Sequence, residues 1–85
     1  MQIEILTPEG NVYNGEAQSI QLPGVEGGFE VLERHAPLIA ALAPGKIRIR
    51  TGTEEIWYEV QGGFVEVLRN HVNVLVEGAE TTQAA

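Results

Sequence analysis

The segment that decides the fold reads Lys46-Ile47-Arg48-Ile49-Arg50. Charged and apolar side chains alternate strictly along it, and such alternation places every second side chain on the same face of a β-strand. The pattern therefore predicts a strand with one buried and one solvated face. Residues 51–53 read as a turn, and residues 55–60 then alternate in the same way.

The rest of the chain repeats this alternation in short stretches. Nine valines and seven isoleucines stand against seven leucines, and β-branched side chains favour sheet over helix. Residues 38–43, between Pro37 and Pro44, are too few for a stable helix. We interpret them as a buried strand or a short helical turn, and favour the strand. Seven or more short strands indicate an all-β sandwich or barrel.

One apolar face per strand defines the predicted core. Its members are Ile3, Ile5, Ile20, Leu22, Ile47, Ile49, Val65, Val67, Val72 and Val74. Asn70-His71 is predicted as a tight reversal, because asparagine tolerates positive φ. The hydrophobic pattern stops after Val76, so we expect one domain over residues 1–78 and a flexible tail over residues 79–85.

Composition excludes several classes of function. The 85 residues include no cysteine and no aspartate, which excludes disulfide scaffolds, thiolate metal sites and aspartate-built calcium loops. Twelve glutamates against five cations give a net charge of −7, which argues against nucleic-acid binding. The first residues carry no basic segment and no long apolar run, so we expect neither a signal peptide nor a membrane span.

No set of side chains predicts catalysis, a metal or a cofactor. His35 and His71 are the only histidines, and no cysteine or aspartate completes a metal site around them. Ser19, the only serine, lies in a strand-like stretch without a neighbouring base. The glutamates at positions 30, 33, 54 and 55 are interpreted as solvated edge charges. Trp57 marks either a partner surface or a sandwich corner.

The glycine-rich stretch over residues 23–29 is predicted to be a mobile loop between two strands. A phosphate-binding loop would precede a helix and usually carry a lysine, whereas this one contains Glu26 and precedes a strand-like segment. Its glycines suit docking onto another surface. We expect this loop and the turn over residues 35–38 to lie together at one end of the sandwich.

Three parts of the chain resemble one known family. They are Ile5-Leu6-Thr7-Pro8-Glu9-Gly10, the stretch over residues 33–49 that contains His35-Ala36-Pro37-Leu38 and Pro44-Gly45, and residues 61–67 with 73–76. Over residues 2–80 the sequence resembles the epsilon subunit of F-type ATP synthases, called delta in mitochondria, in its N-terminal domain. The resemblance implies a flattened sandwich of two mostly antiparallel sheets.

The resemblance also implies a function and two partners. It implies a non-catalytic central-stalk subunit of a proton-translocating synthase, which links the gamma subunit to the c-ring and is peripheral to the cytoplasmic face of an energy-transducing membrane. The implied c-ring contacts are Gly24, Val25, Glu26, Gly27, Gly28 and Phe29. The implied gamma contacts are Thr7, Pro8, His35, Ala36, Pro37 and Leu38.

Two departures from the family qualify this picture. Where some relatives place an acid late in the loop, this chain has Gly28, and Glu26 is the nearest acid. The sequence stops where longer relatives continue into two helices, so we expect no ATP binding and no extended inhibitory state. The alternative functions are a free-standing binding module that uses the 24–29 loop for a ligand or peptide, and, more remotely, a small enzyme with paired glutamates.

Overall fold

The computed structural model describes residues 1–82, and these form strands and turns only. No helix that could cross a membrane occurs in this part of the chain. The strands are β1 Gln2–Thr7, β2 Gly10–Glu16, β3 Ser19–Gly24, β4 Gly27–Leu32, β5 Leu38–Leu42, β6 Gly45–Arg50, β7 Glu55–Val60, β8 Gly63–Leu68, β9 His71–Val76 and β10 Ala79–Thr82. The predicted all-β fold is confirmed, including a strand over residues 38–42. That strand is not the buried strand expected, because only Leu42 is buried and Ile39 is 74% exposed.

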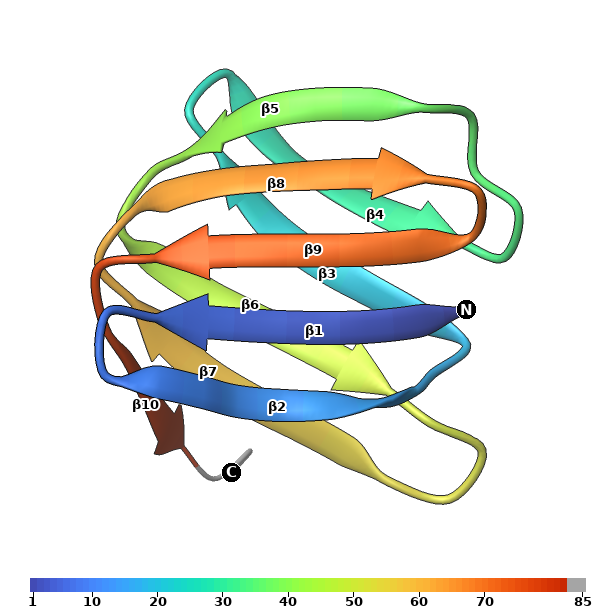
Figure 1. Ribbon diagram of the computed structural model, residues 1–85, viewed down its shortest axis with the longest axis horizontal. Coiled ribbons are helices and arrows are strands. Elements are labelled where there is room, and N and C mark those ends of the chain that lie inside the picture. Colours follow the sequence, from blue (N-terminus) through green and yellow to red (C-terminus); the bar gives the residue numbers. More distant parts are fainter. Residues whose placement is uncertain (83–85) are drawn as a thin grey trace.

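The strands form two layers, and the strands of the rear layer run obliquely behind those of the front layer (Figure 1). The front layer has the order β5-β8-β9-β1-β2, and the rear layer has the order β10-β7-β6-β3-β4. The layers are joined where Gly24 at the end of β3 pairs with Leu42 at the end of β5. All pairs are antiparallel except β1 with β9. This is a sandwich of two mostly antiparallel sheets, continuous along one side.

The core fills the space between the layers. All ten predicted core residues are buried, because each strand turns one alternate face inward. Seven further buried side chains complete it: Met1, Ala17, Val31, Leu42, Tyr58, Val60 and Val76. Tyr58 packs edge-on against Tyr13, with ring centroids 6.3 Å apart. Its hydroxyl donates to the Val12 carbonyl at 3.2 Å, which satisfies the polar end of a buried ring.

Two turns show why particular residues are needed. Arg69 and Asn70 both have positive φ, 52° and 63°, so the reversal occurs one residue before the predicted pair and His71 begins β9. The Asn70 side chain fixes this turn to the preceding segment: its Oδ1 accepts from the Arg34 N–H at 2.8 Å. At Gly63, where φ is 150°, a Cβ atom would lie 2.0 Å from the Leu75 carbonyl oxygen, so only glycine fits.

The predicted tail is wrong for residues 79–82. These residues form β10, an antiparallel edge strand whose Ala79 pairs with Val60 and whose Thr82 pairs with Trp57. Hydrophobic alternation could not reveal this strand, because it is joined mainly by backbone hydrogen bonds to β7 and carries few apolar side chains. Residues 83–85 of the expected tail lie outside the described residues.

Candidate functional site

A groove between β4 and β5 brings most of the predicted contact residues together. β4 is the last strand of the rear layer and β5 the last of the front layer, and the space between them is about 560 Å³. Residues predicted for both partners line it: Gly24, Val25, Glu26, Gly27, Phe29, His35 and Leu38. Most of the residues predicted for the c-ring and two of those predicted for gamma therefore face one concave surface.

The first wall begins with a hairpin, not with the mobile loop predicted from the glycines. Gly24 pairs with Gly27, so only Val25 and Glu26 form the turn. Glycine allows this tight geometry: Gly27 has a φ of 127°, and a Cβ on Gly24 would lie 2.6 Å from the Gly27 carbonyl oxygen. The Val25 N–H donates to the Ala41 carbonyl at 3.0 Å, which fixes the hairpin tip to β5.

The second predicted segment, residues 35–38, lies at the other end of the groove. Arg34 has a φ of 61°, and the His35 N–H donates to the Leu32 carbonyl at 3.2 Å. The His35 Nδ1–H donates to the Ala36 carbonyl at 2.8 Å, which orients the imidazole. The expectation that this turn and the hairpin lie at one end is wrong, because the six residues of β4 separate them by about 20 Å.

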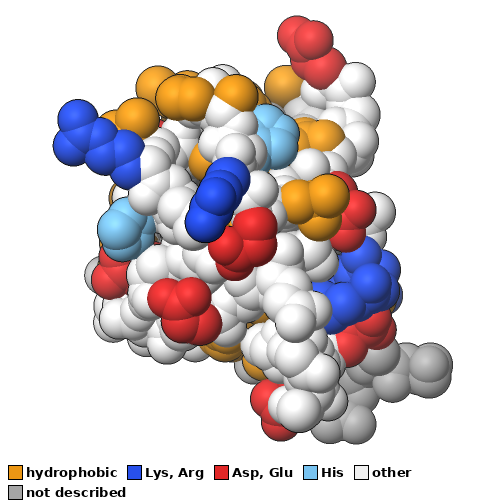
Figure 2. All heavy atoms as spheres, turned by 90° about the vertical axis from the view of Figure 1, so that its right-hand side faces the viewer, with side chains coloured by type: hydrophobic (Ala, Val, Ile, Leu, Met, Phe, Trp, Pro, Cys, Tyr) orange, Lys and Arg blue, Asp and Glu red, His pale blue; other side chains and the backbone are white. Residues whose placement is uncertain are grey.

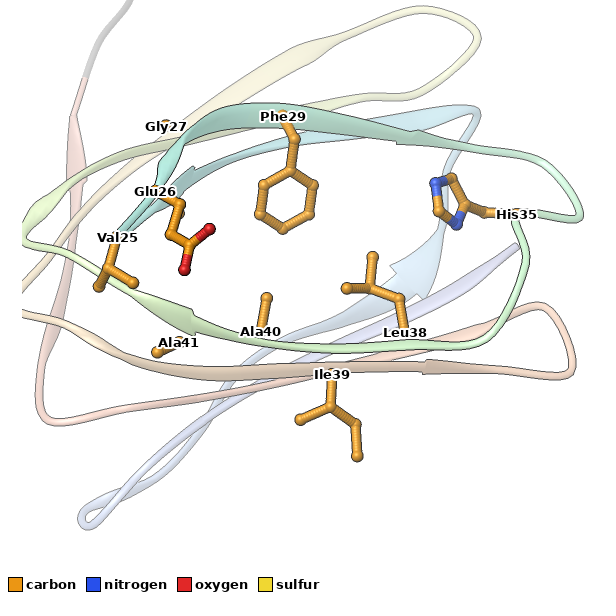
Figure 3. Close-up of a pocket in the computed structure, with 10 residues that line it drawn as sticks. Val25, Glu26, Gly27, Phe29, His35, Leu38, Ile39, Ala40 and Ala41 are labelled. Atoms are coloured by element: carbon orange, nitrogen blue, oxygen red, sulfur yellow. The ribbon is translucent and has the colours of Figure 1, made fainter.

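The interior of the groove is apolar between two polar ends (Figure 3). Phe29 points down from β4, and Leu38 and Ala40 point toward it from β5. The Glu26 carboxylate is turned into the groove at the hairpin end, and the His35 ring lies at the opposite end. The shape and chemistry suit an elongated apolar group with a cationic end beside Glu26.

Thr7 and Pro8 do not join the rest of the predicted gamma-facing set. Thr7 ends β1 and Pro8 follows it in the turn to β2, at the end of the front layer opposite the 35–38 turn (Figure 1). The Thr7 Oγ1 accepts from the Glu9 N–H at 3.2 Å and stabilises the turn. A second, smaller groove of about 350 Å³ lies here, lined in part by Phe64 and Leu75. The predicted set is thus divided between two places.

An apolar surface on the outer face of the front layer was not predicted from the sequence. Four large side chains are between 45% and 74% exposed: Ile39, Phe64, Leu68 and Leu75. The register places Phe64 opposite Leu75 and next to the β5 edge. In Figure 2, which looks at the right-hand end of Figure 1, hydrophobic side chains gather along the top of the molecule, on the β5 side, beside a histidine. Apolar residues at outward alternate positions were the signal, and such a surface is typical of a partner interface.

The outer face of the rear layer is charged. Arg48 pairs with Glu30 at 3.0 Å, and Arg50 pairs with Glu55 at 3.2 Å. The Trp57 Nε1–H donates to Glu55 Oε1 at 3.3 Å, so the indole is held on this face, half-buried. Among residues 1–82 no three metal-ligating side chains lie together. The contrast between the two outer faces makes the front layer and the groove the better candidates for docking.

A polar cluster anchors the segment that leads into the His35 turn. The Met1 ammonium group is paired with Glu33 and donates to the Ala17 carbonyl at 3.1 Å. Asn70 Nδ2 donates to the other Glu33 carboxylate oxygen at 3.3 Å. The hydrogen bond from the ammonium group, with that from Asn70, lowers the pKa of Glu33. The chain beside the groove is therefore held by the folded positions of both β1 and the β8–β9 turn.

Comparison with known proteins gives consistent matches. The family described as ATP synthase, Delta/Epsilon chain, beta-sandwich domain matches residues 1–82. The ATP synthase epsilon chain of Alkalihalophilus pseudofirmus is 38% identical over 84 residues, 99% of this chain and 63% of the relative. That of Helicobacter acinonychis is 42% identical over 79 residues, 93% of this chain and 64% of the relative. The chain thus spans less than two thirds of the length of these relatives.

Solved structures share the fold. A chain of the Euglena gracilis mitochondrial ATP synthase, from a structure of its OSCP/F1/c-ring, superposes with a TM-score of 0.88 at 22% identity and covers 93% of this chain and 51% of that chain. A chain from the central stalk/c-ring structure of Tetrahymena thermophila mitochondrial ATP synthase gives 0.82 at 20% identity, covering 94% and 65%. At these identities the likeness establishes the architecture.

Proposed function

The chain belongs to the family of ATP synthase delta/epsilon β-sandwich domains, and from this premise we propose that it works as a non-catalytic stalk component of an F-type ATP synthase. In this role it joins the gamma subunit to the c-ring and transmits rotation between them. The observation that carries the proposal is the meeting of two docking features, the exposed hairpin tip and the apolar groove, along β4 and β5.

For the c-ring we propose contact through the tip of the β3–β4 hairpin. Val25 is 58% exposed and stands at the turn, next to Glu26. Gly28 and Phe29, which belong to the same predicted set, lie farther along β4, and Phe29 points into the groove (Figure 3). We therefore assign direct contact to Gly24, Val25 and Gly27 at the tip, and a supporting role to residues 28–29 and to Glu26, whose carboxylate is turned into the groove.

For the gamma subunit we propose contact with the groove and the front layer. Leu38 contributes to the groove, whereas Ile39, the next residue, points to the opposite face. A partner seated at β5 would cover the exposed apolar surface and residues 35–38 together. Thr7 and Pro8 would be reached only by a partner that extends along the front layer to the other end of the strands.

We further propose that the domain binds no ATP and lies at the cytoplasmic side of the membrane through its partners. The hairpin has glycines, but the Glu26 carboxylate is turned into the groove and would repel a triphosphate. In a phosphate-binding loop, backbone amides at a helix N-terminus and a lysine would attract it instead.

Assembly with purified partners tests the proposal. Wild-type chain is mixed with the gamma-containing catalytic subcomplex and with detergent-solubilised c-ring, and co-elution is measured. Val25→Asp adds a charge at the hairpin tip and is expected to reduce c-ring association at least 10-fold while leaving gamma binding intact. Val12→Asp, at a residue 37% exposed on β2, is the matched control. Wild-type chain that binds neither partner would overturn the assignment.

A free-standing binding module remains the second candidate function because of the groove itself. Its volume, about 560 Å³, lies within the range of small-ligand sites. This candidate predicts saturable binding of a small apolar cation, such as a benzylammonium, to the isolated chain, with loss of binding in Glu26→Gln.

A further inference from the structure

We propose that the gamma subunit binds this chain by strand addition: an extended gamma segment pairs, backbone to backbone, with the free edge of β5. The identity of the partner rests on the proposed function; the mode of binding rests on the edge described below. Such pairing uses main-chain hydrogen bonds for affinity and alternate side chains for specificity.

The pairing pattern leaves one edge of β5 open. The Ala41 carbonyl accepts from Val25 and the Ala43 N–H donates to Pro23, so residues 41 and 43 direct their backbone groups away from β8. Backbone direction alternates along an antiparallel strand. Ile39 therefore presents its N–H and C=O to the groove, and Ala41 presents its N–H. Within residues 1–82 no strand pairs with these groups, because β3 reaches β5 only at Leu42.

Both faces beside this edge are apolar. On the inner side, Leu38 and Ala40 point into the groove toward Phe29 (Figure 3). On the outer side, Ile39 is 74% exposed and Phe64 on the neighbouring strand is 59% exposed. One added strand would present alternate side chains to both sides, so a single partner segment would cover the open edge, the groove and the exposed side chains.

The negative charge of this chain favours a partner segment that carries a positive charge. The Glu26 carboxylate lies at one end of the groove, and the whole chain carries a net charge of −7. A partner strand with aliphatic residues at alternate positions and a lysine or arginine beside Glu26 would be complementary. The His35 ring limits the opposite end, so about five residues of the partner fit along β5.

The free edge of β4 is the less suitable of the two. Gly24 pairs with Gly27 around a two-residue turn, so Gly28 and Glu30 direct their backbone groups outward. The Glu30 side chain is paired with Arg48 on the charged outer face. Charged side chains at a sheet edge discourage the approach of another strand. This contrast commits the proposal to β5 and makes β4 its internal control.

Hydrogen–deuterium exchange of single amides tests the geometry directly. In the free 85-residue chain, the amides of Ile39 and Ala41 are expected to exchange rapidly, and those of Leu38 and Ala40, paired with β8, slowly. On binding of the gamma-containing catalytic subcomplex, exchange at Ile39 and Ala41 should slow at least 10-fold, while Gly28 and Glu30 remain unchanged. Protection at Gly28 and Glu30 instead, or at neither edge, would overturn strand addition.

A proline variant tests whether the Ile39 N–H donates a hydrogen bond to the partner strand. Ile39→Pro removes an N–H that points to the groove, and proline is tolerated at the open edge of a sheet. It is expected to weaken gamma binding at least 10-fold. Ile39→Val keeps the N–H and a β-branched side chain, so it should lose much less affinity than Ile39→Pro. Equal binding by both variants would contradict the proposal.

Different results would contradict the choice of partner and the mode of binding. If wild-type chain does not bind the gamma-containing subcomplex, the proposed function is wrong. If wild-type chain binds but Ile39 and Ala41 stay unprotected, the partner is right and strand addition is wrong. If Ile39→Pro does not fold, the exchange measurement on wild-type chain still decides.

Discussion

Truncation of Ile49 should destabilise the domain strongly. Ile49 is completely buried on β6, between Ile20 on β3 and Ile56 on β7. Ile49→Ala removes three buried carbons, which costs about 2.4 kcal/mol at about 0.8 kcal/mol per buried methylene. A partly collapsed cavity adds about 1 kcal/mol. We expect a loss of about 3–4 kcal/mol in the free energy of unfolding.

Urea unfolding followed by fluorescence of the single tryptophan, Trp57, measures this loss. Ile39→Ala removes the same atoms from a side chain that is 74% exposed, and should change the stability of the isolated chain by less than about 0.5 kcal/mol. A cost for Ile49→Ala below that value, or equal costs for the two variants, would refute the assignment of the inward face of β6.

Two further predictions concern pH and backbone conformation. Because the pKa of Glu33 is lowered in the fold, this carboxylate stabilises the protein above the pKa it has in the unfolded chain, and the stabilisation is lost as the pH falls through the pKa it has in the folded protein. Thermal melts at pH 7 and pH 3 should therefore show a smaller loss of stability in acid for Glu33→Gln than for wild type. Equal losses would contradict the role of this carboxylate. Gly63→Ala should destabilise by about 3 kcal/mol or more, because a Cβ would collide with the Leu75 carbonyl, whereas Gly52→Ala, with its nearest atom at 3.7 Å, should be nearly neutral in the same urea assay.

The core could be predicted because a single rule governs it. In a two-layer fold every strand turns one alternate face inward, so strands such as Ile47–Ile49 and Val72–Val74 reveal their buried side without knowledge of their neighbours. β10 escaped prediction because its pairing with β7 depends on backbone groups and on a neighbour that lies about twenty residues earlier.

The candidate site was predicted only in part, for a related reason. The sequence pointed to the glycine-rich stretch and the His35 segment, but the mobile loop predicted for the first is a tight hairpin, because glycine content does not distinguish the two. The separation of the two by β4, and the split of Thr7 and Pro8 from His35, follow from strand order, which alternation does not encode. The open edge of β5 likewise could not be predicted, because it depends on β3 pairing with β5 only at Leu42.

The parallel pairing of β1 with β9 has a consequence for how the chain reaches its folded state. Gln2 lies beside His71, so the first strand finds its neighbour across 69 positions of sequence. Contacts of such high sequence separation slow folding, because a long loop must close before they form. During synthesis, the β1–β2 hairpin must therefore wait until β8 and β9 have left the ribosome. The front layer, and with it the docking surface, is therefore completed only once β9 is available to pair with β1.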